Sequence, residues 1–391
     1  MPPRTRLVVA LALAALAFIA PPASAAGRSV PHGWLGAQAD GPMTGAGAAA
    51  FDGEWSLMAA SGVENVRAAF YWSEAQPYRT LDEVPPDRRG AFRDVAGVPT
   101  DFAASDQVVA AAARRHLGVL PVVQRAPGWA REKPFDIASP PRDPATFAAF
   151  MRALVGRYGP QGSFWAERPE LPRMVIHSWQ IWNEPDLDLY WSRQPFQRSY
   201  VKVLRAAHRA LHAADGRART VLAGLPNESF KSLRRIYRAG GKGAFDVIGL
   251  HPYTGKPSNV VKLVKLARKE ARRAKDAKRP IWVTELSWPA ATGRAHGPPG
   301  FTTTDKGQAT RLRQAIPRLA RERKRLRIGR VYWYTWLSEA RGPSAFDFSG
   351  LRRLSPDRSK VASAPALAAF QFSAEELQGC AKSPEDATRC R

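Results

Sequence analysis

Two glutamates occupy matching positions in the sequence, and a carboxylate pair of this kind suits acid–base and nucleophilic chemistry. Glu184 follows the apolar run Val175–Trp182, and Glu285 follows the run Pro280–Thr284. A proline closes each motif, and proline ends a strand because it has no backbone donor. We therefore expect both glutamates at the C-terminal ends of strands. Hydrolysis of a glycosidic bond requires such a pair, one carboxyl as proton donor and the other as nucleophile or base.

The spacing of the two glutamates predicts the fold that brings them together. They lie about a hundred residues apart, which leaves room for three βα units of about 30 residues or more each. If Glu184 ends the fourth strand of a closed barrel, Glu285 ends the seventh, and both side chains reach the catalytic mouth at the C-terminal ends of the strands. The sequence therefore predicts an α/β fold, a single (β/α)8 TIM barrel.

The motifs around the glutamates resemble those of a known group of enzymes. Trp182-Asn183-Glu184-Pro185 and Thr284-Glu285 are similar to the acid/base and nucleophile motifs of glycoside hydrolase clan A, the retaining (β/α)8 enzymes, and most similar to the family 39 and family 5 neighbourhood. The resemblance covers most of the chain, although only the strand ends match sharply. It implies that Glu184 is the acid/base, that Glu285 is the nucleophile and that Asn183 binds the 2-hydroxyl of the sugar.

The same resemblance assigns roles to further residues at strand ends. It implies that Arg67, late in the second strand, lies beneath the nucleophile, and that His251 and Tyr253 after the sixth strand hydrogen-bond to it. Trp336, at the end of the eighth strand, is expected to form the floor of the sugar site, and Trp129 after the third strand to border it. Packing of Trp129 within its own loop is an equally good interpretation.

The elements that must position these residues follow from the periodicity of the chain. Besides the two strands that end at the glutamates, we expect strands at residues 34–38, 63–70, 116–124, 220–225, 245–250 and 330–336. We expect helices at residues 48–61, 102–115, 145–158, 195–214 and 363–370, and two basic helices within 256–279 and 311–330. This alternation completes eight βα units.

The resemblance implies a double displacement by two glutamates on a β-linked oligo- or polysaccharide, with no cofactor. Two alternatives stay open: a glycan-binding barrel without turnover, and a transglycosylase with the same covalent intermediate. The sugar and the linkage also stay open, because specificity depends on loops that a shared fold does not determine. β-Xylosides, β-glucans, uronic-acid-containing glycans and bacterial exopolysaccharides are all compatible, as are endo and exo cleavage.

Residues 1–25 read as a secretory signal peptide. Arg4 and Arg6 precede an apolar run, Leu7–Ala20, which is short for a bilayer span, and Ala23-Ser24-Ala25 is a small-residue cleavage site. An uncleaved membrane anchor is the alternative interpretation. We expect a secreted, extracellular protein that has no membrane segment after signal cleavage.

The rest of the chain is expected to form one domain and a short tail. We place the barrel at residues 26–371 and a polar C-terminal tail at residues 372–391. The tail contains both cysteines, Cys380 and Cys390, and an exported protein matures where disulfides persist. The sequence predicts a Cys380–Cys390 disulfide, with two free thiols as the alternative.

The net charge of the chain indicates which classes of partner it could bind. The net charge is +25, and basic residues are concentrated in the two helices expected within 256–279 and 311–330. An arginine-rich surface without a specific partner explains this charge; the alternative is adhesion to an anionic cell-wall or extracellular polymer. We expect no nucleic-acid partner, since no nucleic-acid-binding motif is present. Seven histidines and two cysteines show no metal-ligand spacing, and the protein is expected to be monomeric and metal-free.

Overall fold

The computed structural model of the chain describes residues 27–44, 49–298 and 300–379. The expected signal peptide at residues 1–25 and the expected disulfide between Cys380 and Cys390 lie outside these ranges, and both stay predictions. Within the described residues, no helix is long and apolar enough to cross a bilayer.

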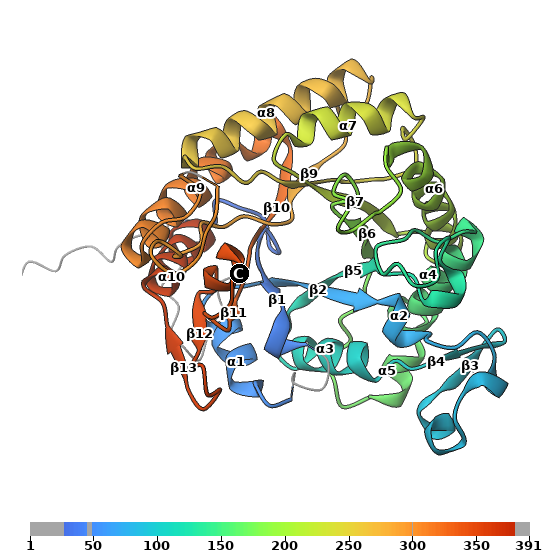
Figure 1. Cartoon of the computed structure of the whole chain (residues 1–391). Coiled ribbons are helices and arrows are strands. Elements are labelled where there is room, and N and C mark those ends of the chain that lie inside the picture. The colour runs from blue at the N-terminus through green and yellow to red at the C-terminus, as the bar shows by residue number, and fades with distance from the viewer. Residues whose placement is uncertain (1–26, 45–48, 299, 380–391) are drawn as a thin grey trace, which may run out of the picture.

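Eight parallel strands close into a barrel, as the sequence predicts for a TIM barrel (Figure 1). Around the barrel the order is β1-β10-β9-β8-β7-β6-β5-β2, and β2 pairs with β1 to close it. The strands are β1 Leu35–Ala39, β2 Asn65–Tyr71, β5 Gly118–Gln124, β6 Ser178–Asn183, β7 Arg219–Pro226, β8 Ile248–His251, β9 Ile281–Val283 and β10 Ile328–Trp333.

An outer ring of helices surrounds the barrel (Figure 1). Its members are α1 Asp52–Ala60, α3 Ala103–Ala113, α4 Pro144–Tyr158, α6 Gln197–Ala214, α7 Ser229–Arg238, α8 Pro257–Arg273, α9 Asp305–Leu326 and α10 Pro365–Gln378. The last helix runs beyond residue 371, the expected end of the barrel, because Ala374 and Leu377 are apolar and buried. Residues 372–378, which were expected in the polar tail, therefore belong to this helix.

Two small sheets lie outside the barrel. Strands β3 (Arg93–Val95) and β4 (Val98–Thr100) form a hairpin that projects away from the ring of helices (Figure 1). Its two-residue turn, Ala96 and Gly97, has positive φ at both positions, which a type I′ turn requires. A three-stranded sheet of β11 (Leu337–Ser338), β12 (Arg352–Leu354) and β13 (Val361–Ser363) follows β10.

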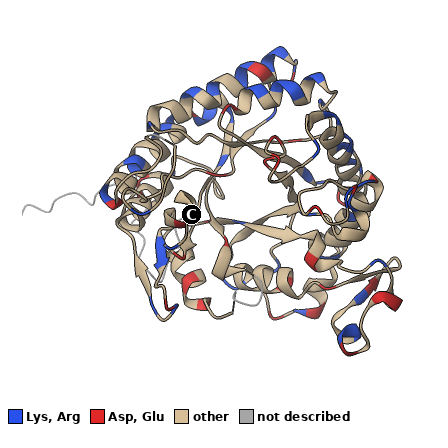
Figure 2. Ribbon diagram, viewed as in Figure 1, with Lys and Arg blue, Asp and Glu red and all other residues tan. Residues whose placement is uncertain are grey.

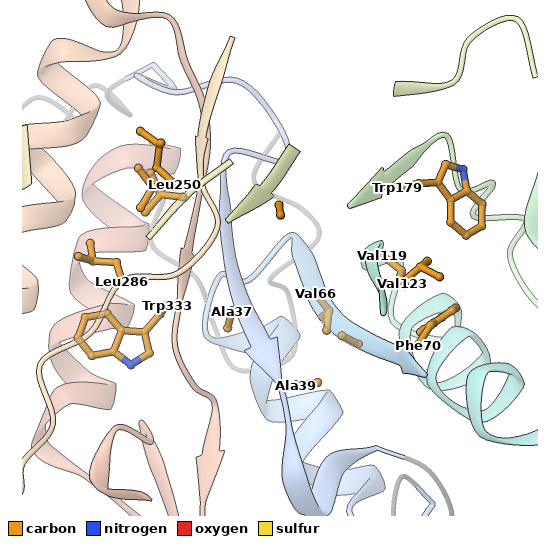
Figure 3. Packing of buried hydrophobic residues seen from close by; sticks show 14 of the residues in the cluster. Ala37, Ala39, Val66, Phe70, Val119, Val123, Trp179, Leu250, Leu286 and Trp333 are labelled. Atoms are coloured by element: carbon orange, nitrogen blue, oxygen red, sulfur yellow. The ribbon is translucent and has the colours of Figure 1, made fainter. Parts of the chain in front are cut away.

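The core has an inner and an outer layer. Inside the barrel, five buried side chains from different strands and strand approaches pack together: Leu120, Val221, Val247, Trp282 and Tyr332. The outer layer fills the space between strands and helices, where Val66, Val123 and Trp179 are among the buried residues (Figure 3). Because close packing on both faces leaves the strands little freedom, residues at their C-terminal ends are held in fixed positions.

Candidate active site

The structure brings Glu184 and Glu285 together at the mouth of the barrel. Glu184 is the first residue after β6, Glu285 follows β9 by two positions, and both are at least nine-tenths buried. One oxygen of each carboxyl and one ring nitrogen of His251 all lie within 4.8 Å of one another. The two carboxyls can therefore flank the same bond of a small ligand.

The backbone that presents Glu184 is in an unusual conformation. Trp182 and Glu184 both have positive φ, 69° and 39°, which side chains other than glycine rarely adopt. The Trp182 indole nitrogen donates to the Tyr190 carbonyl at 2.8 Å, and the Glu184 amide donates to the Gly224 carbonyl at 3.2 Å. Such strain persists only where the surroundings enforce it, and it concentrates at functional sites.

Arg67 lies at the centre of the polar network beneath Glu285. The residue is 1% exposed, and its guanidinium donates to Glu285 Oε1 at 2.6 Å, to Asn183 Oδ1 at 2.8 Å and to Gln180 Oε1 at 2.9 Å. It also contacts Gln38 Oε1. A buried charge is stable only when it is paired and hydrogen-bonded, and Arg67 meets both conditions. The network thus joins the nucleophile candidate to Asn183.

Tyr253 holds the other oxygen of Glu285. The Tyr253 hydroxyl donates to Glu285 Oε2 at 2.6 Å. Burial and the neighbouring Glu285 carboxylate raise the pKa of Tyr253 well above its usual value, so this hydroxyl keeps its proton and remains a donor. With Arg67 on one oxygen and Tyr253 on the other, the Glu285 carboxylate has one fixed orientation.

Glu184 lies in a different environment, beside His251. Burial raises the pKa of Glu184 to about 7, and burial lowers the pKa of His251 to about 3, so the imidazole is neutral at neutral pH. His251 Nδ1 is 2.6 Å from Glu184 Oε1 and 3.5 Å from Glu285 Oε2. Glu184 therefore has a neutral partner and Glu285 a cationic one. Arg67, Asn183, His251 and Tyr253 all lie around the glutamate pair. Tyr253 hydrogen-bonds to Glu285 as expected, whereas His251 hydrogen-bonds to Glu184 instead of Glu285.

The glutamates line a pocket of about 460 Å³ whose walls include residues that the sequence reading missed. Asp40, Tyr71 and Arg125 each stand at or directly after the C-terminal end of a barrel strand. Arg125 stacks over the Tyr71 ring with its guanidinium carbon 4.4 Å from the ring centroid. The rule that barrel chemistry occurs at strand ends would have found these three positions.

An aromatic wall forms the other side of the pocket. Tyr334 and Phe346 line it, and Tyr334 donates its hydroxyl to Asp40 Oδ2 at 3.1 Å. Phe346 packs edge-on against Tyr253, with ring centroids 5.1 Å apart, and at a tilt against Phe301, with centroids 5.4 Å apart. Aromatic faces of this kind suit the C–H faces of sugars. Phe346 comes from a short 3-10 helix after β10, which no motif in the sequence marked.

Trp336 does not form the floor of the pocket, and that expectation is wrong. Its ring is fully buried, and its indole nitrogen donates to Glu54 Oε2 on α1 at 3.0 Å. Strand β10 ends at Trp333, so the alternation of inward and outward side chains cannot be extrapolated to residue 336. Tyr334 lines the pocket in its place.

Trp129 does not border the pocket either. Its indole nitrogen donates to the Gln76 carbonyl at 2.9 Å, and its ring packs edge-on against Trp72 with centroids 5.8 Å apart. Trp129 lines a separate cavity beside the β3–β4 hairpin. Because it lies five residues beyond the end of β5, the intervening turn carries it away from the strand axis, whereas Arg125 stays at the pocket.

Two groups of described side chains have the donor types of a metal site, although the spacing in sequence indicated none. One is the active-site trio Glu184, His251 and Glu285. In that trio the positive charge beside Glu285 is supplied by Arg67.

The second group of this kind is His208, His212 and Asp246, outside the pocket. Asp246 already accepts from His212 Nε2 at 2.8 Å, from the Thr220 amide at 2.9 Å and from Arg279 at 3.1 Å. Protein donors thus already satisfy the carboxylate of this group.

Comparisons with known proteins show the class of fold. No family model matches the chain, and no curated protein is similar to it in sequence. Among solved structures, it is similar to a glucosidase from Croceicoccus marinus (14% identity, TM-score 0.62, covering 90% of this chain and 69% of that one). The fold is therefore that of glycoside hydrolase barrels.

Two further solved structures share this fold. One is a family 39 glycoside hydrolase from the gut symbiont Bacteroides cellulosilyticus WH2 (17% identity, TM-score 0.59, covering 89% of this chain and 64% of that one). The other is a monomeric β-xylosidase from Caulobacter crescentus CB15 (17%, 0.59, 89% and 69%). The chain spans less than two thirds of the family 39 enzyme. The resemblance to clan A is confirmed at the level of the fold.

Proposed function

We propose that the protein is a retaining glycoside hydrolase that cleaves an O-glycosidic bond with Glu285 as nucleophile and Glu184 as acid/base. One observation carries this proposal: two buried carboxyls with oxygens within 4.8 Å of each other, one beside a cation and one beside a neutral imidazole. In retaining enzymes the two carboxyls lie about 5–5.5 Å apart, whereas inverting enzymes need about 6.5–9.5 Å to admit a water.

The geometry supports a double displacement. Glu285, oriented by Arg67 and Tyr253, attacks the anomeric carbon while Glu184 protonates the departing oxygen. Glu184 then takes a proton from the water that releases the sugar from Glu285. Asn183 offers its amide group to the 2-hydroxyl, and its carbonyl oxygen is held by Arg67. The raised pKa of Glu184 supplies the protonated carboxyl that the first step needs.

The substrate in this proposal is a β-linked oligo- or polysaccharide outside the cell. The motif resemblance supports the β-linkage, and residues 1–25 support export. The similar structures include both a glucosidase and a β-xylosidase, so they do not select one sugar. We also propose that the protein acts as a monomer.

The test is product release from a panel of aryl β-glycosides and polysaccharides. The unmutated chain is compared with Glu184→Gln, Glu285→Gln and the control Glu228→Gln, which alters an exposed glutamate that does not line the pocket. We expect activity in the unmutated chain and the control, collapse in both active-site variants, and release of the β-anomer first in proton NMR. Release of the α-anomer first would contradict the retaining mechanism.

Two further readouts separate the alternatives. Azide restores turnover to Glu184→Ala with an activated aryl glycoside if Glu184 is the acid/base. The anion needs no general base, so it attacks the anomeric carbon of the covalent intermediate directly, displaces Glu285 and leaves as a β-glycosyl azide. Product analysis at high acceptor concentration detects transglycosylation. Saturable glycan binding without any turnover in the unmutated chain would reject the enzyme proposal in favour of a glycan-binding barrel.

A further inference from the structure

A second concave surface lies on the outside of the barrel, between helices α4 and α6. This groove, of about 950 Å³, is larger than the catalytic pocket. Its floor includes the small side chains Ala148, Ala206 and Ala210, which pack against one another where the two helices meet. Six basic side chains also line the groove: Arg152, Arg198, Lys202, Arg205, Arg209 and Arg238. We refer to it below as the basic groove.

Helix α6 shows why the charge collects on one side. Arg198, Lys202, Arg205 and Arg209 follow one another at intervals of four, three and four residues, so they lie on one face. All four are exposed, and α6 and α4 contain no Asp or Glu. The stripe extends for about 16 Å along the helix at 1.5 Å per residue. Like charges at this spacing weaken a helix slightly, so folding alone gives no reason for them.

The charges of the basic groove have almost no internal partners. Among the described residues, no carboxylate forms an ion pair with any of its six basic side chains, and Arg205 donates to the Gly240 carbonyl at 2.5 Å. The one acidic residue of the groove, Asp143, caps α4 by accepting from the Ala145 amide. A negative ligand would therefore meet a continuous row of available cations.

Basic residues also lie along helices elsewhere in the ring, such as α8 (Figure 2), but some of those residues have carboxylate partners. On α7, α8 and α9, Glu270 binds Arg234 and Arg273, and Glu322 binds Arg325 and lies 3.6 Å from Lys265. The net charge of the protein is therefore spread over many helices. Two other cavities of the described residues each have only two basic side chains without a carboxylate partner, Arg79 and Arg152 in one and Arg238 and Lys242 in the other, whereas the basic groove has six. This contrast separates it from a merely arginine-rich surface.

We propose that the basic groove is a non-catalytic binding site for a linear anionic polysaccharide. Guanidinium and ammonium groups bind carboxylate and sulfate, and a row of them suits a chain with a charge on each repeat. The groove has no aromatic side chain among its lining residues, which disfavours single-stranded nucleic acid, because stacking platforms hold the bases. It has no large exposed apolar residue either, which an amphipathic membrane-binding surface requires.

The position of the groove links it to the catalytic pocket. Helices α4 and α6 begin after the C-terminal ends of β5 and β6, so the end of the groove near Asp143 and Arg198 opens toward the catalytic face. In the pocket itself, Arg125 lies at the end of β5 without a carboxylate of the described residues within ion-pair distance. The choice of a polysaccharide over other polyanions rests on the proposed hydrolase function, whereas binding of an anionic polymer does not.

The experiment measures binding separately from turnover. The chain carries Glu285→Gln so that no polymer is cleaved, and its affinity for polygalacturonate, dextran sulfate and neutral dextran is measured by titration calorimetry. The test variant is Lys202→Glu with Arg209→Glu. The matched control is Lys262→Glu with Lys269→Glu on α8. It has the same spacing of seven residues and the same charge change, and its two lysines are exposed and form no ion pair with a carboxylate of the described residues. Circular dichroism checks that both variants fold.

We expect the groove variant to lose about tenfold or more in affinity and the control less than about threefold, since exposed charges away from the ligand act only through screened long-range attraction. Tighter binding of polygalacturonate than dextran sulfate indicates a uronic-acid polymer, and the reverse indicates a sulfated one. Equal losses in the two variants would overturn the proposal, since net charge would then explain the binding. Stronger binding of a single-stranded DNA oligonucleotide of equal charge would overturn it as well. Absence of hydrolysis would leave this result unaffected.

Discussion

The catalytic pocket and the basic groove both contain arginine, but the charge of Arg67 in the pocket is buried and paired, whereas the arginines of the groove are exposed and have no ion pair among the described residues. In the pocket, Arg67 is buried and each of its nitrogens donates to a side chain, including Glu285 at 2.6 Å. In the groove, Arg198 and Arg209 are exposed and have no ion pair among the described residues. Burial makes an unpaired charge very costly, whereas water solvates an exposed one.

This difference separates what folding requires from what function uses. Folding requires the ion pair between Arg67 and Glu285, because a buried guanidinium without its carboxylate would destabilise the fold. The exposed basic residues on α6 are not needed for folding, since surface charges contribute little to stability. Substitutions in the pocket should therefore affect turnover and stability together, and substitutions in the groove should affect the binding of polymer alone.

The largest expected effect is on turnover, and it depends on the leaving group. Glu184→Gln removes the proton donor, so kcat/KM for an alkyl or sugar leaving group should fall by about 10²–10⁴-fold. A dinitrophenyl leaving group departs without protonation, so its release should be affected far less. Initial rates on the two substrate types check this, with Arg209→Gln as a control that leaves both rates unchanged. A uniform loss on both substrates would show that Glu184 is not the acid.

The next effect contrasts one buried and one exposed arginine in stability. Arg67→Met leaves Glu285 buried without its cation, and breaking a buried ion pair costs about 3–5 kcal/mol. Arg209→Met removes an exposed charge and should change the free energy of unfolding by less than about 0.5 kcal/mol. Urea unfolding of the two variants measures the difference. Similar free energies for both would mean that the Arg67 network is not important for folding.

A third prediction concerns the pH dependence of stability. Burial raises the pKa of Glu184 from its usual value of 4.5 to about 7 in the folded protein, so the folded state binds this proton more tightly than the unfolded chain. The stabilisation is complete below pH 4.5 and is lost as pH rises through about 7. Glutamine cannot ionise, so Glu184→Gln should be more stable than the unmutated protein at pH 8, by up to about 3 kcal/mol. Thermal unfolding at pH 5 and pH 8 tests this; an equal difference at both values would contradict it.

A further prediction concerns the packing beside His251. A Cβ atom on Gly224 would lie 1.8 Å from His251 Nε2, so Gly224→Ala must displace the imidazole from Glu184. We expect kcat to fall by about tenfold or more, since small misplacements near the reacting groups are costly. The pH above which activity declines should also move, because Glu184 would lose its neighbour. The matched control is Gly216→Ala, whose Cβ meets nothing within 4 Å.

The sequence predicted the barrel well because its signals are local. Apolar strands bounded by Pro or Gly identified the eight strands, and Glu184 and Glu285 were found because each follows an apolar strand that a proline motif ends. Arg67 was assigned from the resemblance to clan A. The two tryptophan assignments failed for the opposite reason. Trp129 and Trp336 lie beyond the ends of β5 and β10, where strand alternation no longer determines direction and only the loop path decides.

The basic groove could not be predicted from the sequence. The stripe on α6 is visible as a periodicity, but its lack of carboxylate partners depends on which helices become neighbours. Helices α8 and α9 have a similar excess of basic residues, yet Glu270 and Glu322 neutralise part of it across the helix boundaries. Only the three-dimensional arrangement shows that α4, which lacks Asp and Glu, is the neighbour of α6.

The smallest expected effect on the enzyme itself comes from salt, and it tests the comparison between the two regions directly. The Debye length is more than about 10 Å at 50 mM NaCl and less than about 8 Å at 500 mM NaCl. Raising the salt between these concentrations therefore weakens contacts between exposed charges and barely affects buried ones. Affinity for polygalacturonate should therefore fall steeply, while kcat/KM on a small uncharged aryl glycoside should stay within about twofold, because Arg67 and Glu285 are shielded from the ions. Parallel titration and rate measurements test this. A salt-sensitive rate on the small substrate would show that the charge pairing in the pocket is open to solvent, and a salt-insensitive affinity would show that the polymer binds by contacts other than the groove cations.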